Sequence, residues 1–316
     1  SRNAENRRAC LRHLTSLHLP RLFCPKIPLP PLLTTTVMRR SLLINITLLV
    51  GVGGFVAGTP GGERQQTMLA GGYDATVGAD PSTPIQLFAL PGNTCPYVQR
   101  THMCLLELGI PFDVTEISGK PDWYLKINPR GKVPSIRVPA SDYATIYESA
   151  ICNEFLCDYY RSNNEEECTL MPDDPYARAE IRLLNDHCDS LGKAQFTYLM
   201  NKDEAKDEEL RSAMDDALGV YEEALAKRRG QYLLGDDFTL ADIHVFPFIQ
   251  RLSVTHRHWK GYELSPERFP RLTGWIGACS ERESARQSSM SEEKTISVYR
   301  KFVEADYSFG GLNKNK

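Results

Sequence analysis

The sequence predicts two consecutive domains, a small α/β domain followed by an all-α domain. Short apolar runs typical of strands alternate with helical patterns from residue 84 to 161, whereas only helical periodicity follows Asp174–Pro175. The polar stretch 161–173 separates the two patterns. A chain of 316 residues is long enough for each domain to bury its own core, so we place the domains at 84–161 and 173–307.

The α/β domain opens with a strand, a turn and a helix. Residues 84–90 form a short apolar run, Pro91–Gly92 mark a turn, and apolar residues at helical spacing run from 96 to 108 before Gly109. Further elements are predicted at 111–117 (strand), 120–125 (short helix or turn), 128–134 (loop), 135–138 and 145–148 (strands) and 149–160 (helix). This order is a thioredoxin-like pattern that begins with a right-handed parallel βαβ unit.

The second domain is predicted to consist of helices only. They are expected near 175–199, 204–229, 240–257, 267–281 and 288–305. The third has the clearest start, because Thr239 can cap it while Asp242 reaches back from the third helical position. The apolar run 243–249 makes this helix central to its domain, so we expect His244 to be a core or boundary residue rather than a ligand.

Cys95 is the candidate nucleophile. It precedes the helix at 96–108, and Pro96 suits the first helical turn, where its missing N–H costs nothing. Free N–H groups and the positive end of the helix dipole favour a thiolate there, so we expect the pKa of Cys95 to lie below the free value of about 8.5. The alternative is an ordinary buried cysteine. Three cysteines inside apolar-periodic segments fit that alternative: Cys104, Cys152 and Cys157.

The residues before the domains contain a targeting pattern. Residues 1–37 are basic and proline-rich, which fits either a transit peptide or sequence upstream of a true start at Met38; we favour the second. Residues 38–58 have the basic start, apolar run and small-residue end of a secretory signal peptide, with an uncleaved anchor as the alternative. Residues 59–82 are a predicted linker. We expect the secretory pathway or an organelle if the signal operates, the cytoplasm otherwise, and a mature protein that begins near Thr59.

Charge and cysteine usage exclude some function classes. The formal net charge of −3 argues against nucleic acid as a partner. Nine cysteines occur without a C-x-x-C pair, so neither a zinc site nor a dithiol redox pair is suggested, and no metal is expected.

Several motifs follow one another in a fixed order. They are Cys95-Pro96-Tyr97-Val98-Gln99-Arg100, Lys120-Pro121-Asp122-Trp123, the loop Asn128 to Pro134, Tyr147-Glu148-Ser149-Ala150-Ile151, the segment Met171 to Ala179, and Leu240-Ala241-Asp242. Over residues 84–305 this set resembles the glutathione transferase family, most of all its omega class, with the plant lambda and dehydroascorbate reductase classes next. The resemblance implies a thioredoxin-like α/β N-terminal domain followed by an all-α helical bundle. The family is commonly dimeric, so it also implies a homodimer.

The resemblance further implies a site for glutathione as co-substrate. In the family the Val133–Pro134 bond is cis, and the backbone of Val133 pairs with the cysteinyl part of glutathione like an added strand. The N–H and hydroxyl of Ser149 would bind the γ-glutamyl carboxylate at a helix start, and Glu148 would accept from its ammonium. Lys120 matches the family lysine that meets the glycyl carboxylate, with Lys132 as the alternative.

The residue at position 95 decides the expected chemistry. The conjugating classes of the family carry Tyr or Ser where this chain has Cys95, and a Cys thiolate beside glutathione forms a mixed disulfide. We therefore expect glutathione-dependent thiol transfer, with dehydroascorbate and glutathionylated small molecules or proteins as substrates. Val98 stands where a glutaredoxin would carry its resolving Cys, so the site is monothiol.

Two alternatives from other classes remain open. One is a glutathione-binding scaffold without catalysis. The other is a membrane-inserting relative like the intracellular chloride channel proteins, which share this fold and the Cys. Against the latter, the helix at 96–108 carries Arg100, His102 and Glu107 and is a poor membrane span. Turnover with a mixed-disulfide substrate would separate the enzyme from both alternatives.

Overall fold

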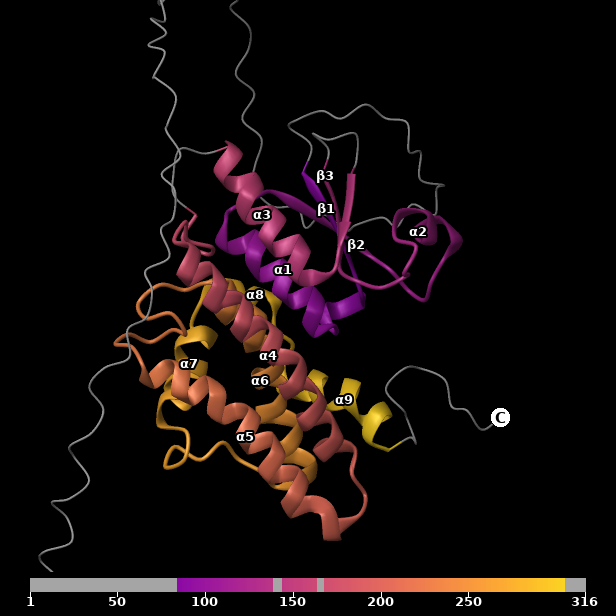
Figure 1. Cartoon of the computed structure of the whole chain (residues 1–316). Helices are drawn as coiled ribbons and strands as arrows, with labels where there is room; N and C mark the ends of the chain where they lie inside the picture. The colour runs from indigo at the N-terminus through magenta and orange to yellow at the C-terminus, as the bar shows by residue number, and fades with distance from the viewer. Residues whose placement is uncertain (1–83, 139–143, 164–167, 305–316) are drawn as a thin grey trace, which may run out of the picture. The chain divides into compact units, whose positions relative to one another are not determined.

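The computed structural model describes residues 84–138, 144–163 and 168–304, which belong to one compact unit (Figure 1). The signal or anchor predicted at 38–58 and the segments predicted on either side of it lie outside the described residues. The elements of the first domain are β1 (Ile85–Ala89), the 3-10 turn η1 (Pro91–Asn93), α1 (Pro96–Glu107), β2 (Phe112–Glu116), α2 (Asp122–Ile127), β3 (Ser135–Val138), β4 (Ala144–Tyr147) and α3 (Ser149–Asn163).

The four strands form one mixed sheet in the order β2-β1-β3-β4. Strand β2 runs parallel to β1, while β3 is antiparallel to both β1 and β4. Leu87 at the centre of β1 pairs with Val114 on one side and with Ile136 on the other. The predicted thioredoxin-like order and its opening βαβ unit are therefore confirmed, with strand ends shifted by at most one residue.

Alternate side chains of β1 enter two separate cores, as expected for a strand covered on both faces. Leu87 packs in the large core that includes α1 and α3, which lie side by side on one face of the sheet (Figure 1). Phe88 packs in a small cluster with Ile117 and with Tyr124 of α2, whose ring centre is 5.4 Å away. Helix α2 is thus anchored to the opposite face.

The regular elements described in the second domain are all helices. Its elements are α4 (Pro175–Met200), the 3-10 turn η3 (Glu204–Lys206), α5 (Asp207–Ala226), α6 (Leu240–Lys260), α7 (Pro270–Ser280), α8 (Glu283–Ser288) and α9 (Glu292–Val303). The sequence did not predict α8, which has only six residues, and the last helix begins four residues later than predicted. Ser291 caps that helix by accepting a hydrogen bond from the N–H of Lys294.

Helix α6 is the central helix of this domain, as predicted. It packs against α4, α7 and α9 and also against α1 of the first domain. The predicted capping box of Thr239 and Asp242 is present, and Asp242 accepts two further bonds, from the N–H of Leu233 (2.9 Å) and from Trp275 Nε1 (2.7 Å). His244 is buried, which confirms its predicted place in the core, and burial together with the charge of Arg100 lowers its pKa well below the ordinary value.

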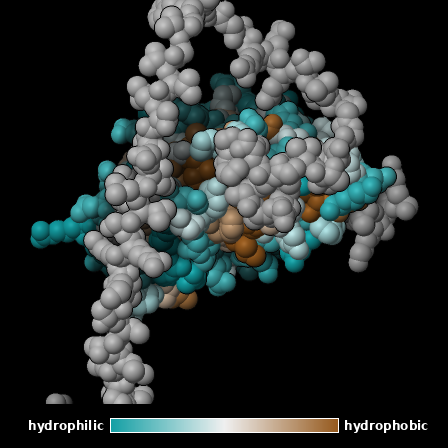
Figure 2. Space-filling view, turned by 90° about the horizontal axis from the view of Figure 1, so that it is seen from above, coloured by the Kyte–Doolittle hydropathy of each residue, from teal (hydrophilic) through white to brown (hydrophobic). Residues whose placement is uncertain are grey.

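The face of the protein seen in Figure 2 is mostly hydrophilic, with apolar side chains gathered in separate patches. In the described part of the chain, the large apolar side chains left exposed are Leu90, Tyr97, Trp123, Ile151, Tyr176, Leu183 and Val220. None of the helices described is both long enough and apolar enough to cross a membrane.

Candidate active site

Cys95 is the N-cap residue of α1, where the sequence predicts it. Its backbone is extended (φ −93°, ψ 121°), Pro96 follows as the first helical residue, and the carbonyl of Cys95 accepts the first intrahelical bond, from Gln99 N–H (3.1 Å). The side chain is half-buried and makes no capping bond. Its Sγ lies 4.0 Å from the carbonyl oxygen of Val133, so the thiol faces the loop before β3.

The prediction that the pKa of Cys95 is lowered is wrong for this structure. Burial raises the pKa of the Cys95 thiol above its ordinary value, because the desolvated thiolate is disfavoured. The backbone N–H groups of Val98 and Tyr97 act in the opposite direction, as the helix start predicts, and so do the charges of Arg251 and Arg100. Sequence reasoning included the helix start and missed the burial of the thiol.

The loop that faces Cys95 is held from within. The Val133–Pro134 bond is cis, as the resemblance implies. The carbonyl of Lys132 accepts hydrogen bonds from the Tyr124 hydroxyl (2.6 Å) and from Asn128 Nδ2 (2.7 Å). The backbone of this loop is therefore fixed beside the thiol, while the side chain of Lys132 stays exposed.

Glu148 and Ser149 meet at the start of α3, also as predicted. Glu148 is a non-glycine residue with φ of 69°, a strained conformation that recurs at functional sites. Its carboxylate pairs with Arg130 at 2.6 Å, and that guanidinium lies 5.3 Å from the centre of the Tyr147 ring. Ser149 is buried, and its hydroxyl accepts from Arg100 Nη1 (3.2 Å). Both predicted partners of glutathione thus already have a protein partner.

The predicted lysines are less closely connected to the site. Lys120 is exposed, and its Cδ lies 3.0 Å from where a Cβ on Gly131 would stand, so it borders the loop that ends in Val133–Pro134. Within the described part, the structure gives no direct contact of Lys120 or Lys132 side chains with Cys95.

Two buried arginines belong to the site, and sequence reasoning gave them no role. Arg100 donates to the carbonyl of His244 (2.7 Å) and lies over the Phe248 ring at 4.5 Å, which joins α1 to α6. Arg251 follows Phe248 by three residues on α6 and is 4% exposed. The signal that could have identified Arg251 was an arginine inside a helix that is buried on nearly all sides.

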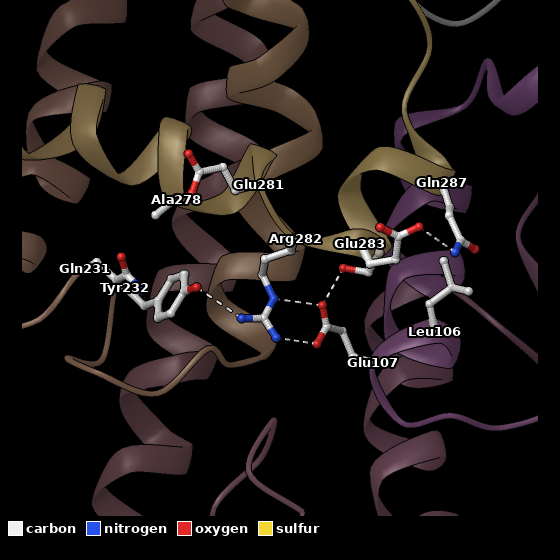
Figure 3. A pocket seen from close by; sticks show the side chains of 10 residues that line it. Leu106, Glu107, Gln231, Tyr232, Ala278, Glu281, Arg282, Glu283 and Gln287 are labelled. Atoms are coloured by element: carbon white, nitrogen blue, oxygen red, sulfur yellow. Dashed lines mark hydrogen bonds and ion pairs between the residues drawn. The ribbon is translucent and has the colours of Figure 1, made fainter.

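A cavity of about 460 Å³ lies at the other end of α1 (Figure 3). Glu107, the last residue of α1, pairs there with Arg282 at 2.5 Å, and Arg282 Nη1 donates to the Tyr232 hydroxyl at 3.0 Å. Neither Cys95 nor Glu148 lines this cavity. Among the residues the structure describes, no group of three or more His, Cys, Asp or Glu side chains could hold a metal ion.

Comparison with known proteins identifies the family. The family model described as glutathione S-transferase, N-terminal domain, matches residues 94–158, and the model for the C-terminal domain matches residues 203–278. Glutathione S-transferase omega-2 of Rattus norvegicus is 30% identical over 182 residues, which are 56% of this chain and 69% of the rat protein. The chain belongs to the glutathione transferase family.

Other relatives agree with this membership. The probable glutathione S-transferase DHAR1, cytosolic, of Oryza sativa subsp. japonica is 27% identical over 213 residues, 67% of this chain and 91% of the rice protein. The crystal structure of glutathione transferase Omega 3C from Trametes versicolor matches with a TM-score of 0.61 and 28% identity, over 70% of this chain and 91% of that one. The two-domain fold predicted from the sequence is that of the family, and glutathione is the family's co-substrate.

Proposed function

We propose that this protein is a glutathione-dependent thiol transferase of omega type with dehydroascorbate reductase activity. The observation that carries the proposal is Cys95 at the N-cap of α1, with its sulfur 4.0 Å from the Val133 carbonyl. A sulfur nucleophile at this place forms and exchanges disulfides, which a hydroxyl cannot do. The omega and DHAR names of the relatives support the same reaction class.

For dehydroascorbate, the two electrons and two protons would come from two glutathione thiols, which leave as glutathione disulfide by way of a Cys95–glutathione disulfide. For a glutathionyl mixed disulfide, the proposed reaction is two successive disulfide exchanges. The Cys95 thiolate attacks the glutathione sulfur of a mixed disulfide, a new S–S bond joins Cys95 to glutathione, and the substrate leaves as a thiolate that takes a proton from water. A second glutathione, as its thiolate, then attacks the bound glutathione sulfur, which releases glutathione disulfide and the Cys95 thiolate. The charges of Arg251 and Arg100 and the N–H groups of the first helical turn favour the thiolate in both steps.

Glutathione is proposed to lie across the ends of three elements. The backbone of Val133 would pair with its cysteinyl part, Glu148 with its ammonium, and the start of α3 at Ser149 with its γ-glutamyl carboxylate. Lys120 or Lys132 would meet the glycyl carboxylate. Because Glu148 already pairs with an arginine, binding would exchange that partner or share the carboxylate with it.

The decisive test compares two kinds of turnover in the purified full chain and its Cys95→Ser variant. We expect the chain to reduce dehydroascorbate and a glutathionyl mixed disulfide, and to conjugate a chlorinated dinitrobenzene only weakly. The Cys95→Ser variant should lose both reductions and keep its fold, since Ser also caps helices. Strong conjugation without reduction in the unmodified protein would contradict the proposal, as would a Cys95→Ser variant that still reduces mixed disulfides at the original rate.

We propose in addition that the protein forms a homodimer through α3 and α4. Three of the exposed apolar side chains lie there, Ile151 on α3 (57% exposed) and Tyr176 and Leu183 on α4 (84% and 71%). The pair of Arg182 with Glu154 joins the two helices at 2.6 Å, so their outer faces are continuous. Sedimentation should give a dimer, and Leu183→Glu should shift it towards monomer; a monomeric unmodified chain would exclude the proposal.

A further inference from the structure

The turn just before Cys95 is held by both domains. It is formed by η1, and both Gly92 (φ 67°) and Asn93 (φ 56°) have left-handed backbone conformations. The N–H of Gly92 donates to Glu116 Oε1 at the end of β2 (3.0 Å), which fixes the turn to its own sheet. From the helical domain, Arg251 Nη2 donates to the carbonyl of Asn93 (3.3 Å). The position of Cys95 therefore depends on a side chain from α6.

Arg251 also contacts the first turn of α1. Its Nη1 donates to the Gln99 side-chain carbonyl and to the carbonyl of Pro247 (2.9 Å), while its Nε–H is buried without a hydrogen-bond partner in the described part of the chain. The acceptors that hold the guanidinium are neutral. A buried charge without an opposite charge is costly, so a purely structural role would be better served by a neutral side chain.

The charge of Arg251 favours the thiolate of Cys95, which lies two residues after the Asn93 carbonyl that Arg251 holds. The titratable groups that interact with Cys95 are Arg100 and Tyr97 on α1, Arg251 on α6 and Tyr299 on α9. The loop before β3 faces the sulfur with a backbone carbonyl. No carboxylate acts on the thiol among these groups, and the two arginines are the cations that oppose the cost of burying a thiolate.

We propose that Arg251 is a positioning residue for Cys95. Arg251 holds the turn at Asn93 through one guanidinium nitrogen and stabilises the thiolate with its charge. The proposal rests on Cys95 being the nucleophile of the proposed function. It makes α6 of the helical domain part of the thiol site, so that docking of the two domains and activation of the sulfur depend on the same side chain.

The test measures the alkylation rate of Cys95 by iodoacetamide between pH 7.5 and 9.5, followed by mass spectrometry of its peptide. Arg251→Met should lower the rate at pH 7.5 about three- to tenfold, because each unit of pKa change alters the thiolate fraction about tenfold. The deficit should shrink as the pH rises and more thiolate forms. Arg251→Lys keeps the charge and should recover most of the rate at pH 7.5. Thermal unfolding followed by circular dichroism identifies variants that are folded.

Arg257→Met is the matched control. Arg257 lies on the same helix and pairs with Glu292 of α9 at 2.6 Å, but it is half-exposed and has no contact with the turn. Its loss should leave the alkylation rate unchanged. An Arg251→Met rate equal to that of the unmodified protein, a deficit that does not change with pH, or an equal deficit in Arg257→Met would overturn the proposal. If Arg251→Met does not fold, Arg251→Gln replaces it. Alkylation needs no turnover, so an enzyme without thiol transferase activity would refute the proposed function and still test Arg251.

Discussion

An arginine lies near each end of helix α1, but the polar groups at the two ends are hydrogen-bonded to different degrees. At its C-terminal end, Glu107 accepts from Arg282 Nε (2.8 Å), from Arg282 Nη2 (2.5 Å) and from the Ser284 hydroxyl, and its side chain is 12% exposed (Figure 3). At its N-terminal end, Cys95 has one weak contact at 4.0 Å, and the nearby Arg251 keeps a buried N–H without a described partner.

This difference separates a structural end from the end that we propose to be reactive. The Glu107 carboxylate accepts three hydrogen bonds from protein donors, although a cavity lies beside it. The Cys95 end has a half-buried thiol and an arginine with an unused donor, and Glu148 of the proposed site has a strained backbone. Cavity volume alone directs attention to the Glu107 end of the helix. The buried N–H of Arg251 without a described hydrogen-bond partner directs it to the Cys95 end, where we propose the chemistry.

Arg282→Met should give the largest change, and it should be a change in stability. The substitution leaves the buried Glu107 carboxylate without its ion partner. Full burial would make that cost about 3–5 kcal/mol, and the partial exposure of Arg282 (29%) reduces our expectation to about 1–3 kcal/mol. Urea unfolding measures it. The Cys95 end should keep its glutathione affinity.

Arg286→Met provides the comparison for that experiment. Arg286 lies four residues further along, on α8, and pairs with Glu283 at the surface, with 57% of its side chain exposed. Its loss should change the free energy of unfolding by no more than about 0.5 kcal/mol. If both variants lose the same free energy of unfolding, the hydrogen bonds at Glu107 stabilise the protein no more than a surface ion pair does.

Glu148→Ala should give the next largest effect, confined to the reactive end. Removing a charge-assisted contact to the glutathione ammonium weakens binding, and we expect about a tenfold rise in Kd, because the carboxylate is 43% exposed and already shares Arg130. Isothermal titration with glutathione measures the Kd. Glu208→Ala is a suitable control, since it removes an exposed glutamate that pairs with Arg211 within α5. Equal affinities in the Glu148 variant and the unmodified chain would remove Glu148 from the site.

Most of the fold could be predicted from local sequence patterns. The apolar run at β1, the Pro96 helix start and the capping box of Thr239 with Asp242 are each specified within a few residues, and each is present. The short helix α8 was missed because six residues give too little periodicity.

The site was less predictable because its electrostatics come from distant parts of the chain. The placement of Cys95 follows from its neighbours in sequence. The arginine that holds the turn before it comes from α6, more than 150 positions later, and the Arg251–Gln99 bond spans 152 residues. The contact of Ser149 with Arg100 likewise joins α3 to α1. No spacing rule in one sequence indicates such pairs.

The smallest expected effect is a difference in how the two ends respond to pH. Because burial raises the pKa of Cys95 above its ordinary value, the thiol holds its proton more tightly than an exposed cysteine, and less thiolate exists at pH 7. The alkylation rate of Cys95 should therefore be lower than that of free glutathione at pH 7 and should still be rising at pH 9. At the other end, bonds to Glu107 raise the pKa of Arg282, so that guanidinium stays charged throughout this range. The folded state binds the proton of Cys95 more tightly than the unfolded chain does. The contribution of Cys95 to the free energy of unfolding should therefore decrease as the pH rises from 7 to 9. Peptide mass spectrometry after timed alkylation measures the rate, and a plateau below pH 8 would show instead that the helix start and the two arginines outweigh burial.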